Sequence, residues 1–141
     1  LCIDQGIGVL VFSPLHGGYL SGKYRRGQPW PEGARFKKPT VDGGWPVNME
    51  EIYRIVDELE IVAQAHNTTI AQAALNWVLN KPAVSSLIIG IRTAKQLEEN
   101  IGATDWKMTP EEVERLDAVS EPVRRHPYHK YNPVKKKPNN T

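Results

Sequence analysis

Cysteine is almost absent from this sequence, since Cys2 is the only one among its 141 residues. An internal disulfide is therefore excluded, and with it a disulfide-stabilised scaffold. The single thiol fits a reducing compartment, and we expect a cytoplasmic protein. The sequence also lacks any run of eighteen apolar residues, so we expect no transmembrane helix and no membrane partner. Its four histidines are not spaced with cysteines or clustered carboxylates, so we expect no metal site.

Positive charge is concentrated at the end of the chain. Residues 1–120 carry 12 basic and 15 acidic side chains, whereas residues 121–141 carry six basic side chains against the single acid Glu121. Four prolines in this last segment oppose helix formation. Two interpretations are open: Lys135–Lys137 attracts nucleic acid or anionic lipid, or the segment is a solvated terminus. We favour the terminus, and predict a folded unit over 1–120, a mobile tail over 121–141 and no nucleic-acid partner.

Two short apolar runs, residues 7–12 and 84–89, predict strands that are buried on both faces, as in a parallel sheet. Helical patterns lie between and after them, which indicates an α/β protein. Residues 1–5 are expected to end a preceding helix, with Gly6 as its stop signal. Strands of this kind need strand neighbours on either side, so one pair of strands predicts part of a larger sheet.

Four helices are predicted from capping residues that are followed by apolar positions at helical spacing. Their predicted starts are Asn48 with Glu51, Thr69 with Gln72, Thr93 with Gln96, and Thr109 followed by Pro110. The first two helices are expected to end at His66-Asn67 and at Lys81-Pro82.

A segment rich in proline and glycine, residues 25–47, separates the first predicted strand from the first predicted helix. A loop of this length inside a compact domain is usually functional or disordered. Its two tryptophans, Trp30 and Trp45, indicate that part of the loop packs against the folded unit.

The second predicted strand is followed by Gly90, Arg92 and the start of a predicted helix. The unpaired N–H groups of a helix N-terminus attract anions, and the guanidinium of Arg92 would bind a phosphate with two hydrogen bonds. Gln96, Glu99 and Asn100 share one helix face and offer donors and acceptors suited to a purine. An ordinary capped surface helix explains the same spacing, so the residues alone leave both interpretations open.

The first predicted strand is followed by a loop that contains Ser13, Gly17, Gly18 and Lys23. A hydroxyl, two glycines and a lysine suit an anion, although their spacing is not that of a Walker-type loop. A solvent-exposed loop is the alternative. Because ligands bind at the carboxyl ends of parallel strands, two such loops on one side of a sheet favour a phosphate site.

These two segments resemble the aldo-keto reductase family, in the branch that includes the potassium-channel beta subunits. Residues 13–24 are similar to the loop after the family's seventh strand, and residues 90–100 to its eighth strand and nucleotide-binding helix. The resemblance implies a TIM-type (β/α)8 barrel that binds NADP(H) without a Rossmann domain. Such a barrel needs about 250 residues. We therefore expect the C-terminal part of a barrel, with its last two strands, whose partner is the missing N-terminal half.

The resemblance also implies which residues hold the cofactor. Ser13, Leu15 and Gly17 would line the pyrophosphate, with Lys23 beside the phosphates. Arg92 would pair with the 2′-phosphate and so favour NADP(H) over NAD(H). The remaining implied cofactor-binding residues are Gly90, Gln96, Glu99, Asn100 and, near the adenosine half, Arg35.

The family's catalytic Asp, Tyr, Lys and His would lie upstream of Leu1, so the resemblance implies no catalytic residue in this chain. In the complete protein, NADPH would reduce an aldehyde or ketone to an alcohol, whereas the isolated chain would be inactive. His16, where the family commonly has a small residue, and Tyr19 are expected to line the substrate pocket. The alternatives are a non-catalytic NADP(H)-sensing module, similar to a channel beta subunit, and a self-associating inactive fragment. The substrate's identity and homo-oligomerisation stay open.

Overall fold

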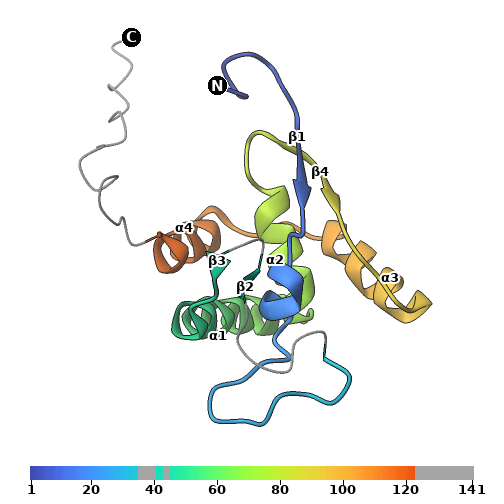
Figure 1. Ribbon diagram of the computed structural model, residues 1–141. Coiled ribbons are helices and arrows are strands. Elements are labelled where there is room, and N and C mark those ends of the chain that lie inside the picture. The colour runs from blue at the N-terminus through green and yellow to red at the C-terminus, as the bar shows by residue number, and fades with distance from the viewer. Residues whose placement is uncertain (35–40, 43–44, 123–141) are drawn as a thin grey trace.

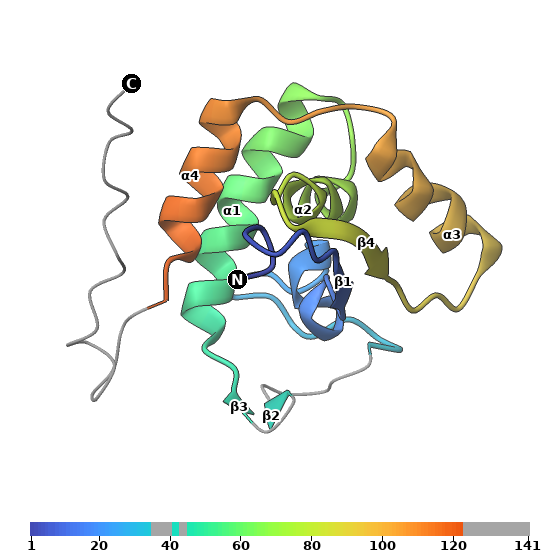
Figure 2. The same ribbon diagram turned by 90° about the horizontal axis from the view of Figure 1, so that it is seen from above.

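The computed structural model describes residues 1–34, 41–42 and 45–122; the predicted tail lies outside this range from residue 123 onward. Helices α1, α2 and α4 pack together, and α2 leads into a small parallel sheet (Figures 1 and 2). The elements in chain order are β1 (Val9–Phe12), the 3-10 helix η1 (His16–Ser21), β2 (Val41–Asp42), β3 (Trp45–Pro46), α1 (Met49–Ala65), α2 (Ile70–Leu79), β4 (Val84–Ile88), α3 (Ala94–Ile101), the 3-10 helix η2 (Gly102–Thr104) and α4 (Pro110–Ser120).

Strands β1 and β4 pair in parallel, with Val11 beside Leu87 and Phe12 beside Ile88 (Figure 1). The two predicted strands and their parallel pairing are confirmed, although both strands are shorter than predicted. Since the strands are parallel, the loops that leave them begin at the same edge of the sheet. This edge carries the two motifs that the sequence singles out.

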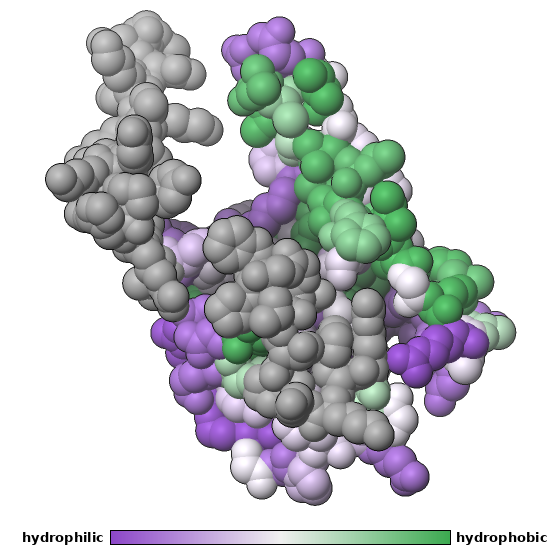
Figure 3. Space-filling model, viewed as in Figure 1, coloured by the Kyte–Doolittle hydropathy of each residue, from purple (hydrophilic) through white to green (hydrophobic). Residues whose placement is uncertain are grey.

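One face of this sheet is exposed, so the prediction that both strands are buried on both faces is wrong for the described residues. Leu10 is 63% exposed and Phe12 is 80% exposed. We call the apolar side chains on this side the exposed apolar surface, and Figure 3 shows it as a green area over the strands and towards α3. Its members are Leu10, Phe12, Ile88, Ile91, Leu97 and Ile101. The described helices pack elsewhere, so these side chains meet no covering layer within the described residues.

The segment before β1 ends as the sequence predicts for the end of a helix, although residues 1–5 are too few to be more than one turn. The N–H of Gln5 donates to the carbonyl of Leu1 at 2.9 Å, that of Gly6 to Ile3 at 3.4 Å and that of Ile7 to Cys2 at 2.8 Å, which is the Schellman pattern of a helix C-terminus. Gly6 follows with φ +64°, a left-handed conformation that glycine adopts without steric cost. The predicted stop signal at Gly6 is therefore confirmed.

All four helices begin at their predicted N-caps. These caps are Asn48, Thr69, Thr93 and Thr109. Helices α2 and α4 have the complete reciprocal capping box, in which each side chain bonds the other residue's backbone N–H. At α1, the side chain of Asn48 accepts a hydrogen bond from the N–H of Glu50 at 3.1 Å, in place of the predicted box with Glu51.

The core lies between α1, α2 and α4. Helix α1 contributes Leu59 and Val62 with no exposed surface, and α4 contributes Leu116, which is also fully buried. Burying a side chain of this size stabilises the fold by about 1.5–3 kcal/mol. The complete inward face of α1 is Ile52, Val56, Leu59, Val62 and Ala63.

Asn76 of α2 is a buried polar side chain that holds the segment between α3 and α4. Its amide group donates to the carbonyls of Ala103 and Trp106, both at 2.8 Å, and its oxygen accepts from the N–H of Met108 at 3.3 Å. An unpaired buried backbone group costs about 1–3 kcal/mol, so this side chain satisfies groups that would otherwise be expensive to bury.

A histidine–carboxylate contact joins the end of α1 to the start of α4. Nε2 of His66 lies 2.9 and 3.0 Å from the two carboxylate oxygens of Glu112, and the His66 ring stacks on Trp106 at 4.3 Å between centroids. Burial by itself would raise the pKa of Glu112. The hydrogen bonds from Thr109 and His66 outweigh burial, so the pKa lies below its ordinary value of 4.5.

This depressed pKa makes the fold sensitive to acid. A carboxyl group with a lower pKa in the folded state contributes stability that is present above the unfolded pKa and is lost as the pH falls through the folded pKa. We expect Glu112→Gln to lower the free energy of unfolding by about 1 kcal/mol near neutral pH. The difference from the wild type should shrink as the pH falls below the ordinary pKa of 4.5 and through the lower pKa of the folded state. Urea denaturation across this range measures it.

Glu111→Gln is the matched control, because Glu111 is exposed in the same helical turn. This control should change the free energy of unfolding little at any pH. A Glu112→Gln effect that stays constant down to the lowest pH would contradict an ionised Glu112 as the source of the stability.

Candidate functional site

A cavity of about 890 Å³ lies at the carboxyl ends of β1 and β4. Its first wall comes from residues 13–23 after β1, and its second wall from residues 89–100 after β4. Residues 31–34 of the long loop and the start of α2, at Thr69 and Ala71, complete the lining. The volume is in the range of small-molecule and cofactor sites.

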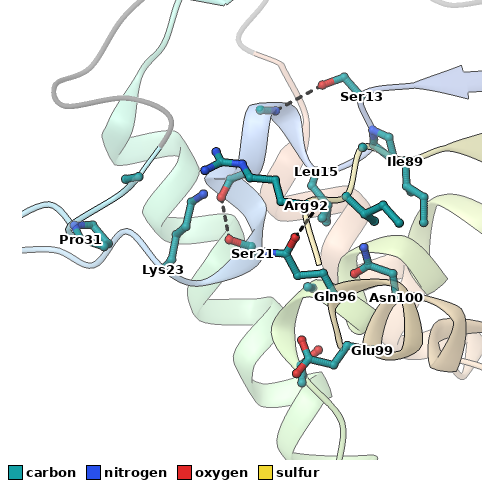
Figure 4. A pocket seen from close by; sticks show the side chains of 18 of the residues that line it. Ser13, Leu15, Ser21, Lys23, Pro31, Ile89, Arg92, Gln96, Glu99 and Asn100 are labelled. Carbon is teal, nitrogen blue, oxygen red and sulfur yellow. Dashed lines mark hydrogen bonds between the residues drawn. The ribbon is translucent and has the colours of Figure 1, made fainter. Parts of the chain in front are cut away.

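The structure brings together almost all of the cofactor-binding residues that the sequence implies. Those that line the cavity are Ser13, Leu15, Gly17, Lys23, Gly90, Arg92, Gln96, Glu99 and Asn100. Figure 4 shows the side chains of Lys23 and Arg92 extending into the space between the two walls. Arg35 lies outside the described residues.

The two residues expected to contact substrate are not among the lining residues of this cavity. Tyr19 has no exposed surface and belongs to the core, so its predicted place in a substrate pocket is corrected. Its ring packs against Tyr24 at 5.1 Å and against Trp30 at 6.3 Å between centroids. His16 is half-buried and lies beside Tyr19, with 5.6 Å between ring centroids.

The first wall begins with a tight turn whose backbone is strained. Ser13 has φ +53° and His16 has φ +49°, a left-handed region that non-glycine residues adopt at some cost. Gly17 and Gly18 follow in the same region, at +65° and +97°. Ser13 closes the turn by accepting a hydrogen bond from the N–H of Gly17 at 3.3 Å (Figure 4). Such strain gathers at functional sites, and here it shapes the cavity wall.

Gly18 leaves room for the lysine of the same wall. A Cβ atom added at Gly18 would lie 2.8 Å from Nζ of Lys23 and 3.1 Å from its Cε. The carbonyl of Gly18 also accepts a hydrogen bond from the hydroxyl of Ser21 at 2.7 Å. The absent side chain therefore lets Lys23 fold back over the turn.

The first wall is anchored to the core by aromatic and ionic contacts. The Tyr24 ring packs against Trp30 at 4.7 Å between centroids, which confirms that part of the long loop packs down. Trp45 is among the residues whose side chains are not described. Next to Tyr24, Arg25 makes two hydrogen bonds of 2.8 Å to the carboxylate of Glu60 in α1. The hydrogen bonds from Arg25 hold the pKa of Glu60 below its ordinary value.

The second wall is shaped by Gln96, whose side chain turns back towards the strand. Its Oε1 accepts a hydrogen bond from the backbone N–H of Arg92 at 2.9 Å (Figure 4). The backbone N–H of Gln96 donates to the hydroxyl of Thr93 at 3.2 Å. The predicted capping box with Thr93 is therefore only half formed. The side chain of Arg92 donates to the carbonyl of Gly33 at 3.4 Å, which links the second wall to the long loop.

The charges around the cavity suit a phosphate-bearing ligand that also has a polar, uncharged part. Lys23 and Arg92 supply positive charge, and Glu32 and Glu99 supply negative charge on the same lining. A guanidinium binds phosphate with paired hydrogen bonds, whereas a carboxylate accepts from hydroxyl or amino groups. Within residues 1–34, 41–42 and 45–122, no three His, Cys, Asp or Glu side chains gather as metal ligands. No helix in this described part has the length and apolar character needed to cross a membrane.

A sequence model of the aldo/keto reductase family matches residues 1–121. The chain belongs to the aldo/keto reductase family. Among its curated relatives, "Aldo-keto reductase str7" of Strobilurus tenacellus is 32% identical over 84% of this chain, and a "Probable voltage-gated potassium channel subunit beta" of Arabidopsis thaliana is 32% identical over 91%. "Aldo-keto reductase yakc [NADP(+)]" of Schizosaccharomyces pombe is 31% identical over 82%. The chain spans 34%, 40% and 33% of these relatives' lengths, which is little more than a third.

A comparison with a solved structure confirms the fold. The glycerol dehydrogenase of Gluconobacter oxydans matches 86% of this chain with a TM-score of 0.64 and 23% sequence identity, and the match covers 38% of that structure. The described residues of this member of the family thus adopt the fold of a part of a TIM barrel. The α/β class and the barrel that the sequence implies are confirmed.

Some residues that line the cavity were not assigned to it from the sequence of this aldo/keto reductase chain. They are Pro14, Ser21, Pro31, Glu32, Gly33, Ala34, Thr69, Ala71, Ile89 and Ile91. Most of them are sequence neighbours of the motif residues, so the position of each motif in the sequence could have predicted that they line the cavity. Thr69 and Ala71 are different, because they reach the cavity through the packing of α2 between the two walls. Their local sequence carries only a helix-start signal.

Replacement of Gly18 tests the first wall as an anion site. We expect Gly18→Ala to weaken the binding of inorganic pyrophosphate to the full-length protein by about tenfold, because a side chain at φ +97° is strained and would displace Lys23. Isothermal titration calorimetry measures the dissociation constant.

Gly27→Ala is the matched control for backbone strain. Gly27 has φ +72°, but an added Cβ would meet nothing within 4 Å, and Gly27 does not line the cavity. Equal dissociation constants for the Gly18→Ala variant and the wild type would contradict the assignment of this turn to an anion.

Proposed function

We propose that this chain binds NADP(H) and forms the cofactor-binding part of a reductase of aldehydes or ketones. The observation that carries the proposal is that Lys23 and Arg92 line opposite walls of one cavity, at the carboxyl ends of β1 and β4. Ligands of parallel-stranded barrels bind at this end of the strands. The cavity's glycine turn, two cations and purine-compatible side chains fit a dinucleotide that carries an extra phosphate.

The first wall suits the pyrophosphate of such a cofactor. Gly17 and Gly18 keep the turn free of side chains, so a ligand can approach the backbone closely. Lys23 brings a compact positive charge to the same wall. Ser13 and Leu15 complete this part of the lining, one with a hydroxyl and the other with an apolar surface.

The second wall suits the adenosine half. Arg92 offers a planar guanidinium for the 2′-phosphate, which is the group that distinguishes NADP(H) from NAD(H). Gln96, Glu99 and Asn100 follow on the same helix with amide and carboxylate groups for the ribose and the adenine. The printed name of the Schizosaccharomyces pombe relative, which includes NADP(+), supports this choice of cofactor.

NADPH supplies a hydride that reduces a carbonyl carbon. The residues of this chain hold and orient the nucleotide, and the acid–base residues belong to other parts of a complete barrel. Accordingly, we assign no catalytic role to the tyrosines or histidines described here. A folded unit over residues 1–120 and a separate basic tail remain part of this proposal, as does a cytoplasmic location, which rests on the single cysteine.

The exposed apolar surface supports the place of this chain in a larger barrel. Phe12 and Leu10 of β1 are mostly exposed, although a strand of this composition is typical of the buried sheet of a barrel. Further strands that close the sheet into a barrel would bring inward-facing side chains of their own against the exposed face. We therefore propose the remaining part of the barrel as the partner of this surface; a second copy of the chain is the alternative partner, as in a self-associating fragment.

A non-catalytic NADP(H)-sensing module is a second candidate function. The observation that favours it is the relationship to proteins named as potassium-channel beta subunits. Both functions need the same nucleotide site. Turnover of a small aldehyde by the full-length protein separates them, because a sensing module would bind NADPH without oxidising it at a useful rate.

Arg92→Ala tests the choice of cofactor. We expect the variant to bind NADPH about 10- to 100-fold more weakly in the full-length protein, because a charge-assisted pair with the 2′-phosphate is lost, and to bind NADH nearly unchanged. Fluorescence titration with both cofactors measures this. Lys107→Ala is the control, since Lys107 is an exposed cation that does not line the cavity. An equal loss of affinity for NADPH and NADH would contradict a contact between Arg92 and the 2′-phosphate.

A measurement on the isolated chain of 141 residues tests whether the catalytic groups lie outside it. We expect no reduction of a small aldehyde by NADPH, since the chain supplies binding groups and no acid–base set. Absorbance of NADPH at saturating aldehyde measures the rate against that of the full-length protein. A rate close to that of the full-length protein would place the catalytic groups inside this chain and contradict the proposal.

A further inference from the structure

Helix α2 begins between the two walls of the cavity and contacts both. Its first turn contributes Ala71 to the lining, next to its N-cap Thr69. On the side of the first wall, Ile70 packs so closely on Gly22 that an added Cβ at Gly22 would lie 2.6 Å from the Cδ1 atom of Ile70. Gly22 ends η1 with φ +79°. The start of α2 is therefore fitted against the end of the first wall.

On the side of the second wall, Gln72 makes the contact. Its Oε1 accepts a hydrogen bond from the N–H of Thr69 at 3.0 Å, which closes the capping box of α2. Its Nε2 donates to the carbonyl of Glu99 in α3 at 2.7 Å. The side-chain amide of Gln72 thus makes one hydrogen bond within α2, through its oxygen, and one to α3, through its nitrogen.

Helix α3 depends on contacts of this kind because it has no buried residues. Apolar burial, the usual source of helix stability in proteins, contributes little here. Among the described residues, two side-chain hydrogen bonds reach α3 from other helices: the bond from Gln72, and a bond of 2.9 Å from Thr104 of the adjoining η2 to the carbonyl of Ile101. Of the two, only the Gln72 bond comes from α2, on the other side of α3 from η2 in the chain. Asn76 adds an indirect restraint, through its hydrogen bond to Ala103 in the following η2.

The glycine at position 102 fits this contact. Gly102 has φ −57°, which any residue adopts, so its backbone does not require glycine. An added Cβ would lie 2.5 Å from Nε2 of Gln72, however. The missing side chain therefore makes room for the amide group that bonds Glu99.

From these contacts we propose that Gln72 is a positioning residue for the nucleotide. Its hydrogen bond holds the C-terminal end of α3 against the start of α2. This contact sets the distance between the first wall and the cavity-lining residues Glu99 and Asn100, and the bound nucleotide has to span that distance. Gln72 does not line the cavity and acts through α3. This inference rests on the proposed NADP(H) site and adds a determinant of its affinity.

Two substitutions break the contact from opposite sides. Gln72→Glu keeps an oxygen for the N–H of Thr69 but places a second acceptor against the carbonyl of Glu99. Gly102→Ala adds no charge and pushes the amide of Gln72 away, while the helix end accepts alanine without strain. Gln72→Lys has the reverse effect of Gln72→Glu, because it loses the acceptor of the capping box but keeps a donor for Glu99.

The test measures the dissociation constant of adenosine 2′,5′-bisphosphate and the steady-state KM and kcat with NADPH, all on the full-length protein. We expect Gln72→Glu and Gly102→Ala to raise the dissociation constant and the KM about five- to tenfold, the range for loss of one hydrogen bond, with kcat unchanged. Gln72→Lys should remain closer to the wild type. Gln64→Glu, the same chemical change at an exposed position of α1, is the control and should have no effect.

Different failures are distinguishable. If the wild type does not bind adenosine 2′,5′-bisphosphate, the proposed nucleotide site itself is overturned. If the wild type binds and both Gln72→Glu and Gly102→Ala bind equally well, only the role of Gln72 is overturned. A greater loss in Gln72→Lys than in Gln72→Glu would show that the capping box matters and the bond to α3 does not, which also overturns the proposal. Should Gln72→Glu fail to fold, Gly102→Ala decides alone.

Discussion

The parallel pairing of β1 with β4 determines where the other functional parts of the molecule lie. Val11 lies beside Leu87, and both strands run towards the same edge of the sheet. Because of this direction, the loop after β1 and the helix after β4 begin next to each other. An antiparallel pairing would place Lys23 and Arg92 at opposite ends of the sheet, and no single ligand could contact both. The proposed phosphate site therefore depends first on the direction of the two strands, because that direction brings its residues together.

The features that follow from local patterns could be predicted from the sequence. All four N-caps are where the spacing of capping residues places them, because a cap is decided by residues three positions apart. The cavity residues of the two motifs are also predicted, since each motif directly follows a strand. The bond from Gln72 to Glu99 was not predictable in this way. The sequence shows the capping role of Gln72, whereas its second hydrogen bond depends on how α2 and α3 pack.

The errors have a common physical cause, which is that burial is decided by the whole fold. Tyr19 lies on a loop whose glycines and cation suggest an open ligand site, yet its ring is enclosed by Tyr24 and Trp30, which come from further along the chain. Phe12 belongs to a run whose composition predicts a buried strand, yet it is 80% exposed within the described residues. In both cases the residue type is compatible with either environment. Only the neighbours that the fold supplies decide between them.

The two walls of the cavity are held by different kinds of interaction. The first wall is held by an aromatic cluster and by the ion pair of Arg25 with Glu60, and such contacts keep its strained turn in place. The second wall is carried by α3, which has polar contacts on one side and exposed apolar side chains such as Leu97 and Ile101 on the other. Whatever covers those apolar side chains adds the burial that α3 lacks in the described residues. The affinity of the adenosine half should then depend on the assembly of the barrel around α3 as well as on Arg92. The affinity of the pyrophosphate half depends mainly on the first wall, whose restraints lie within this chain.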